Sequence, residues 1–153
     1  MHSHRIVHRD LKCANLLLSA EGVVKVADFG VSRQISGLFT QNNELSTMVG
    51  SPCWMAPEVM RGGGYGRRAD IWSVGCCVIE MRAGDPPFSE LDNACAIMFR
   101  VGMEGQTPPC PECMSQEMCD FVKLCVTVDP QQRPTASDLL ALPYLTNART
   151  PRS

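Results

Sequence analysis

Four polar residues near the start of the chain have side chains suited to chemistry on phosphate. Asp10, Lys12 and Asn15 are close together in sequence, and Asp28 follows a short apolar stretch. Carboxylate and amide oxygens are ligands that Mg²⁺ prefers, so Asn15 and Asp28 are candidate metal ligands. Asp10 can accept the hydrogen bond of an attacking hydroxyl as a base, and Lys12 can neutralise charge on a transferred phosphoryl group. Each residue alone would be read as a solvated loop residue, so the prediction depends on the set and its spacing.

Three short motifs contain or follow these residues in a fixed order. They are His8-Arg9-Asp10-Leu11-Lys12-Cys13-Ala14-Asn15, Asp28-Phe29-Gly30 and Ala56-Pro57-Glu58. Each motif is a weak signal alone, but the ordered set is specific, and residues 70–75 and Arg133 follow it. The order and spacing resemble the catalytic loop, the metal-binding loop and the end of the activation segment of eukaryotic serine/threonine protein kinases. The resemblance runs from Met1 to about Leu145.

Two details narrow this resemblance. Lys12, two residues after Asp10, follows the serine/threonine pattern rather than the tyrosine kinase pattern. The stretch from Gly50 to Glu58 resembles the Gly-Thr-Pro-x-Trp-Met-Ala-Pro-Glu segment of the MAP kinase kinase kinase and Ste-type group, with Ser51 replacing the usual threonine. Because serine keeps the hydroxyl, we expect Ser51 to contact Asp10 and Lys12 where substrate binds.

The resemblance also implies the cofactors, ATP and Mg²⁺. Asp28 would connect the metal ions to the phosphates, together with Asn15. Leu17 would pack beneath the adenine ring. Gly30 would supply backbone freedom directly after the metal ligand.

Five further residues receive structural roles from the resemblance. His8 and Phe29 would belong to the stacked column of side chains that regulates kinases, with Asp70 as its anchor. Glu58 and Arg133 would form the ion pair that ties the activation segment to the helical core. A plain core position is the competing interpretation for each of them.

The hydrophobic pattern predicts the elements that position these residues. Residues 16–18 and 24–26 alternate as two strands of an antiparallel hairpin. Helical patterns follow at 70–81, 93–101 and 116–126, and a capping box at Thr135–Asp138 opens a last helix that runs through Leu142. Residues 34–51 read as a long surface loop. The expected fold class is therefore mainly α: a protein-kinase-like C-lobe, that is, a helical bundle with a short antiparallel β-hairpin.

The expected organisation is one domain with a short tail. Residues 1–145 form a kinase C-lobe fragment, with the catalytic loop at 8–15 and the activation segment at 28–58, and residues 146–153 form a C-terminal tail. The 153 residues contain no glycine-rich phosphate loop and no N-lobe lysine or glutamate motif. We therefore expect the N-lobe to be absent and the isolated polypeptide to bind ATP poorly. A catalytically inert, kinase-derived binding fragment is the alternative function.

Composition limits the partners. The chain is 44% hydrophobic and 20% charged, with a formal net charge of −2. These values are typical of a globular domain without a basic field for nucleic acid. The most apolar stretch, residues 71–81, is too short to span a bilayer, so no membrane insertion is expected. The expected partners are a protein substrate such as a downstream kinase, and an upstream activating kinase unless autophosphorylation activates the chain.

Nine cysteines without a secretory signal point to a reducing compartment, and we expect a cytoplasmic location. Cys110 and Cys113 have the spacing of metal ligands, but no second pair completes a four-ligand zinc site. A coincidence of the proline-rich loop is the favoured interpretation.

Thr47 stands where related kinases are phosphorylated, with Ser46 as the second candidate. Phosphate at Thr47 would add about −1.5 to −2 charge and pair with Arg9, which would order the activation segment. In a complete kinase built on this chain, Thr47→Ala should therefore lower activity, with phosphate found on Thr47 by mass spectrometry of the active protein. Full activity of the variant would show that Thr47 is not the switch.

Overall fold

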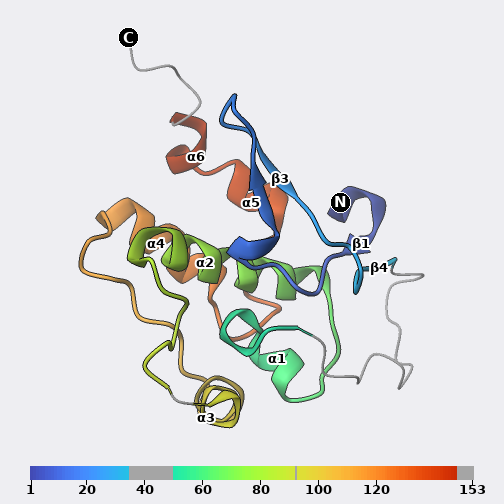
Figure 1. The fold of residues 1–153 in the computed structure, drawn as a ribbon, viewed down its shortest axis with the longest axis vertical. Helices are drawn as coiled ribbons and strands as arrows, with labels where there is room; N and C mark the ends of the chain where they lie inside the picture. The colour runs from blue at the N-terminus through green and yellow to red at the C-terminus, as the bar shows by residue number, and fades with distance from the viewer. Residues whose placement is uncertain (35–49, 92, 148–153) are drawn as a thin grey trace.

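The long helix α2 is the centre of the structure, and the other elements are arranged around it (Figure 1). The computed structural model describes residues 1–34, 50–91 and 93–147. Its helices are α1 (Pro57–Met60), α2 (Arg67–Ala83), α3 (Ala94–Met98), α4 (Gln116–Cys125), α5 (Ala136–Leu140) and α6 (Pro143–Asn147). Short 3₁₀ helices lie at η1 (His2–His4), η2 (Cys13–Asn15) and η4 (Pro52–Trp54), and a π-helix lies at η5 (Phe99–Met103). The mainly α fold expected from the sequence is confirmed.

The predicted hairpin is present with the predicted bounds. Strands β2 (Leu16–Leu18) and β3 (Val24–Val26) pair antiparallel, with Leu16 opposite Val26. A second, unexpected pairing joins β1 (Ile6–Val7) to β4 (Arg33–Gln34). Gln34 was expected to begin the surface loop, and that boundary is wrong. Two-residue strands are too short to show a period, so only the folded chain reveals them.

Helix α2 is buried on most of its surface, as its apolar sequence predicts. It begins at Arg67, three residues before the expected start. The prediction missed these residues because the charged residues of the first turn hide the periodic apolar pattern. The helix ends at Gly84, which has a φ of 90° and donates its N–H to the carbonyl of Glu80 at 2.8 Å. Glycine adopts this left-handed conformation without the steric cost of a Cβ atom.

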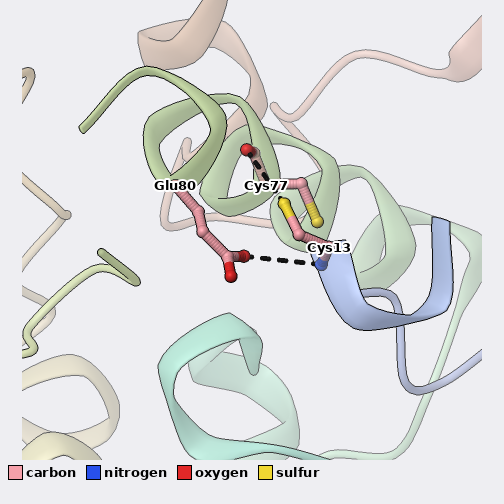
Figure 2. Close-up of side chains that lie close together, drawn as sticks. All are labelled: Cys13, Cys77 and Glu80. Atoms are coloured by element: carbon pink, nitrogen blue, oxygen red, sulfur yellow. Dashed lines mark hydrogen bonds between the residues drawn. The ribbon is translucent and has the colours of Figure 1, made fainter. Parts of the chain in front are cut away.

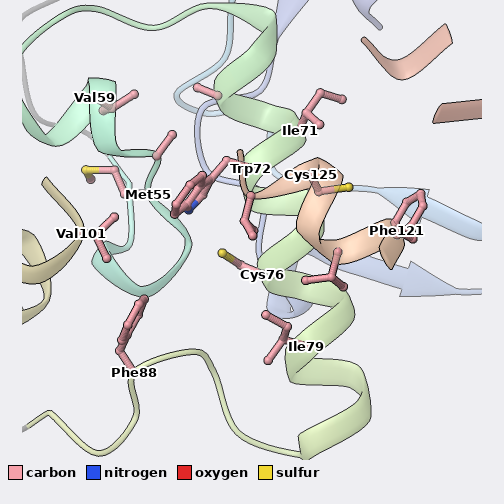
Figure 3. Close-up of a cluster of buried hydrophobic side chains, with 14 of the residues drawn as sticks. Met55, Val59, Ile71, Trp72, Cys76, Ile79, Phe88, Val101, Phe121 and Cys125 are labelled. Atoms are coloured by element: carbon pink, nitrogen blue, oxygen red, sulfur yellow. The ribbon is translucent and has the colours of Figure 1, made fainter. Parts of the chain in front are cut away.

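The hydrophobic core lies between α2, α4 and the segment around α1 (Figure 3). Trp72, which is 1% exposed, is one of its largest members. Cys76 and Ile79 of α2 belong to the same cluster, together with Met55 and Phe121. The cluster therefore joins α2 to segments that come before and after it in sequence.

Other helix boundaries also differ from the sequence prediction. The capping box is present, with Thr135 Oγ1 accepting from Asp138 N and Asp138 accepting from Thr135 N. However, α5 ends at Leu140 and α6 starts at Pro143, because proline disfavours a helical conformation in the residue before it. Asn93 is the N-cap of α3 rather than its first residue, and α3 passes into the π-helix at Phe99. None of the helices in the described part of the chain is long and apolar enough to cross a bilayer.

At Gly75, helix α2 packs closely against the end of α4. A Cβ atom there would lie 2.8 Å from Cys125 Cβ and 2.9 Å from Val126 Cγ1. Gly75→Val should therefore lower the free energy of unfolding by about 3 kcal/mol, because the core cannot accept the added volume. Urea unfolding followed by tryptophan fluorescence measures this change.

Met81→Val is the matched control, since Met81 is on the same helix but 59% exposed. It should cost only the lower helix propensity of valine, below about 0.7 kcal/mol. Equal losses in the two variants would contradict the close approach.

Candidate active site

The carboxylate of Asp70, at the first turn of α2, holds the start of the catalytic-loop motif. The backbone N–H of His8 donates to Asp70 Oδ2 at 2.9 Å, and that of Arg9 donates to Oδ1 at 3.0 Å. His2 Nε2 lies 2.8 Å from Asp70 Oδ2. Arg9 has a φ of 76°, and the Tyr65 hydroxyl donates to its carbonyl at 2.7 Å. The sequence assigned no role to His2 or Tyr65.

Asp10, Lys12 and Ser51 form a closed set of polar contacts. Lys12 Nζ lies 3.0 Å from Asp10 Oδ2 and donates to Ser51 Oγ at 3.0 Å. Ser51 donates to Asp10 Oδ1 from its backbone N at 3.1 Å and from Oγ at 3.2 Å. The structure thus brings together three residues that the sequence assigned to one site, although 41 positions separate Asp10 from Ser51.

Asn15 is buried beside Asp10. Its Nδ2 donates to the Asp10 carbonyl at 2.8 Å and to Asp10 Oδ2 at 3.4 Å. This orientation leaves Oδ1 pointing away from those two acceptors. The Asn15 side chain can therefore offer its oxygen, rather than its nitrogen, to a ligand.

Asp28 reaches the same region through the backbone. The N–H of Ala27 donates to the carbonyl of Asn15 at 2.8 Å. Asp28 has a φ of 59°, and its Oδ1 accepts the N–H of Gly30 at 3.2 Å. Among the described residues no hydrogen bond joins the side chains of Asn15 and Asp28. Asp28 is exposed, and no ion pair to its carboxylate occurs within the part of the chain that the structure describes.

His8 and Phe29 are stacked edge to face. Their ring centroids are 5.1 Å apart at an angle of 68°. His8 is fully buried, and its Nε2 lies 2.9 Å from the Ala27 carbonyl. Phe29 is 48% exposed, so only His8 is a core residue in this structure.

Glu58 and Arg133 form a bidentate ion pair. The two guanidinium NH groups of Arg133 lie 2.8 and 3.0 Å from the Glu58 oxygens. Arg133 also donates to the carbonyls of Thr127 and Arg68, and it stacks over Trp72 at 5.2 Å. Arg133 is 0% exposed, and the N–H groups of its guanidinium donate to partners inside the protein.

Of the three residues predicted to have a regulatory role, only Arg9 lies in the described part of the chain. Ser46 and Thr47 lie outside the described residues. Arg9 is 5% exposed, and its guanidinium lies 5.2 Å from the Tyr65 ring centroid. Gly50 has a φ of 122°, and a Cβ atom there would lie 3.0 Å from the Arg9 carbonyl. The chain therefore passes close to Arg9 just before Ser51.

The hairpin exposes apolar side chains to solvent. Leu17 is 58% exposed, and Leu18 and Val24 are 71% and 54% exposed. Leu17 and Leu18 are successive residues of a strand, so these exposed apolar side chains are divided between the two faces of the hairpin. Leu17 is therefore accessible to a ligand in this structure.

The cysteines are arranged differently from their spacing in sequence. All nine are free thiols. Cys110 Sγ donates to the Cys119 carbonyl and Cys113 Sγ to the Arg82 carbonyl, each at 3.8 Å. In the described ranges these two thiols join no metal-ligand cluster. Such a cluster forms instead from Cys13, Cys77 and Glu80.

Only part of that cluster was visible in the sequence. Cys77 and Glu80 are three residues apart on the predicted helix and so share a face. Cys13 lies 64 positions before Cys77, and no sequence pattern connects them. Burial, followed by the hydrogen bond and charge of Glu80, raises the pKa of Cys13 to about 12. Burial also raises the pKa of Cys77 strongly.

Comparisons with known proteins agree with this geometry. Residues 1–145 match the family described as Protein kinase domain. The chain is 43% identical over 147 residues to mitogen-activated protein kinase kinase kinase A of Dictyostelium discoideum. The aligned region covers 96% of this chain and 15% of that protein. The chain is 45% identical over 146 residues to mitogen-activated protein kinase kinase kinase 2 of Arabidopsis thaliana, covering 95% of this chain and 22% of that protein.

A human relative extends the comparison. Over 144 residues the chain is 46% identical to mitogen-activated protein kinase kinase kinase 4 of Homo sapiens, covering 92% of this chain and 9% of that protein. The chain therefore spans less than a quarter of the length of each of these relatives.

Asp70→Asn tests how the catalytic-loop motif is held. One amide oxygen can still accept one backbone N–H, but the amide NH₂ then faces the other donor. We expect the free energy of unfolding to fall by about 1.5–3 kcal/mol, the value of a hydrogen bond to a charged group.

Asp120→Asn is the control, because that carboxylate is 59% exposed and pairs only with Lys123 among the cations described. Its effect should stay below about 1 kcal/mol. Equal stability of Asp70→Asn and the parent chain, measured by urea unfolding, would rule out the proposed role of Asp70.

Proposed function

This chain belongs to the protein kinase family, and from that premise we propose that it carries the substrate lobe of a serine/threonine kinase that transfers phosphate from ATP to proteins. The observation that supports this most directly is the position of Asp10. Lys12, Ser51 and Asn15 all contact this carboxylate. Such a network fixes the orientation of a base before substrate arrives.

Asp10 acts first on the substrate hydroxyl. Its carboxylate accepts the hydroxyl hydrogen bond and orients the oxygen for attack. Lys12, already beside Asp10, neutralises negative charge on the phosphoryl group as it is transferred. Ser51 comes from the activation segment, so its two bonds to Asp10 connect the substrate platform to the base.

Asn15 and Asp28 fit a magnesium–nucleotide complex by their donor chemistry. Both offer hard oxygens: the amide Oδ1 of Asn15 and the exposed carboxylate of Asp28. When bound, Mg²⁺ neutralises phosphate charge. Leu17 would cover one side of the adenine ring, and its exposure suits that role.

The chain needs further groups for efficient transfer. Nucleotide affinity in kinases comes from a glycine-rich cover and a lysine on the phosphates, and neither motif occurs in the 153 residues. We therefore propose that these residues alone bind ATP·Mg²⁺ weakly. The exposed apolar side chains of the hairpin are consistent with a surface that works only when covered.

The names of the relatives suggest the protein substrate. A mitogen-activated protein kinase kinase kinase acts, by its name, on another kinase. We propose a downstream kinase as substrate, with activation by an upstream kinase or by autophosphorylation at Thr47 or Ser46. Nine free thiols suit the reducing cytoplasm.

The test uses a complete kinase domain that contains these residues. Asp10→Asn should reduce phosphoryl transfer by about 10²–10⁴-fold, the usual contribution of a positioned base. Asp28→Asn should abolish transfer through loss of a metal ligand. Transfer of radiolabelled phosphate to serine/threonine and tyrosine peptides measures both effects and the acceptor preference.

Glu21→Gln is the control, because Glu21 is exposed in the hairpin turn away from these residues. Circular dichroism confirms that each variant is folded. Activity retained in Asp28→Asn would refute the assignment. No activity in the parent domain, with normal folding, would favour the inert binding fragment.

A further inference from the structure

Three potential metal ligands converge where the catalytic-loop motif meets α2 (Figure 2). They are the thiols of Cys13 and Cys77 and a carboxylate oxygen of Glu80, and all lie within 4.8 Å of one another. Cys13 belongs to η2, whereas Cys77 and Glu80 are on α2. None of the three belongs to the residues proposed for phosphoryl transfer or to the Cys110–Cys113 pair.

The ligand types select a class of ion. Two sulfur atoms and one carboxylate suit a thiophilic cation such as Zn²⁺, whereas Mg²⁺ requires oxygen ligands. With Zn–S bonds of about 2.3 Å, two sulfurs on a tetrahedral ion are about 3.8 Å apart. The sulfurs here are no more than 4.8 Å apart, so small side-chain rotations are sufficient.

Neighbouring groups already orient two of the ligands. Trp54 Nε1 donates to Glu80 Oε2 at 2.8 Å, and the backbone N–H of Cys13 reaches the same oxygen at 3.4 Å. Both nitrogen donors use Oε2, which leaves Oε1 for an ion. Cys13 Sγ lies 3.5 Å from the Cys77 carbonyl, so its thiol is directed at α2. Outer contacts of this kind hold metal ligands in place.

The cluster is also accessible. Cys77 is 3% exposed, but Cys13 and Glu80 are only half-buried. An ion can therefore approach from solvent on the side of Cys13 and Glu80, while Cys77 closes the inner side. A water molecule can supply the fourth ligand, as in zinc sites with three protein ligands.

We propose that Cys13, Cys77 and Glu80 form a binding site for one Zn²⁺ ion. On binding, two S–H bonds break, two S–Zn bonds form, and two protons pass to solvent without any oxidation. The ion would connect the catalytic-loop motif to α2 through a residue next to Lys12. Binding itself is independent of the proposed kinase function.

The experiment is calorimetric titration of the full, reduced chain with Zn²⁺ in a phosphine reductant. We expect one ion per chain, and Co²⁺ should give a thiolate-to-metal charge-transfer band at the same stoichiometry. Cys13→Ser and Cys77→Ala should each weaken Zn²⁺ binding by about 100-fold or more, beyond the usual effect of an outer-shell change. Glu80→Gln should also weaken it, although the amide oxygen can still accept from Trp54.

The matched control is the double variant Cys110→Ser/Cys113→Ser, which removes the other pair with ligand spacing. It should bind Zn²⁺ like the parent chain. Thermal unfolding by circular dichroism confirms folding, and the Zn²⁺-dependent rise in Tm should disappear in Cys13→Ser and remain in the double variant. Absence of binding by the parent chain, binding unchanged in Cys13→Ser, or loss confined to the Cys110/Cys113 variant would each overturn the proposal.

Discussion

The buried carboxylate of Asp70 is the constraint on which the site depends. It is 1% exposed and receives the backbone N–H groups of His8 and Arg9 from a segment 61–62 positions away. Its place in the first turn of α2 also suits a negative charge, because the N-terminus of a helix carries a partial positive charge. The position of Asp10 is therefore set by the central helix rather than by its own loop.

A second buried contact fixes the segment that contains Ser51 and Glu58 to the same helix. Arg133 connects Glu58, which follows Ser51 in sequence, with the carbonyl of Arg68 in α2 and with the Trp72 ring. A charge removed from water in this way is retained only when its partners are complete. Asp10 and Ser51 thus reach each other because both of their segments are fixed to α2.

The thiols show that α2 also positions residues that belong to no sequence motif. Burial favours the neutral thiol, and it raises the pKa of Cys125 to about 12, so this cysteine packs as a small apolar side chain. Burial and the carboxylate of Glu80 raise the pKa of Cys13 to about 12 as well, but Cys13 is only half-buried, so a ligand can reach it. The contrast between the two residues arises from their surroundings and not from cysteine spacing.

The sequence by itself determined the local features: the hairpin at 16–18 and 24–26, the capping box at Thr135, and the family, through motifs whose residue types suit phosphate chemistry. These depend on periodicity and on neighbours a few positions apart, which a single chain displays directly. The tertiary structure decided the β1–β4 pairing and the grouping of Cys13 with Glu80. Such contacts join segments far apart in sequence, and only the packing of the whole chain around α2 brings those segments within bonding distance.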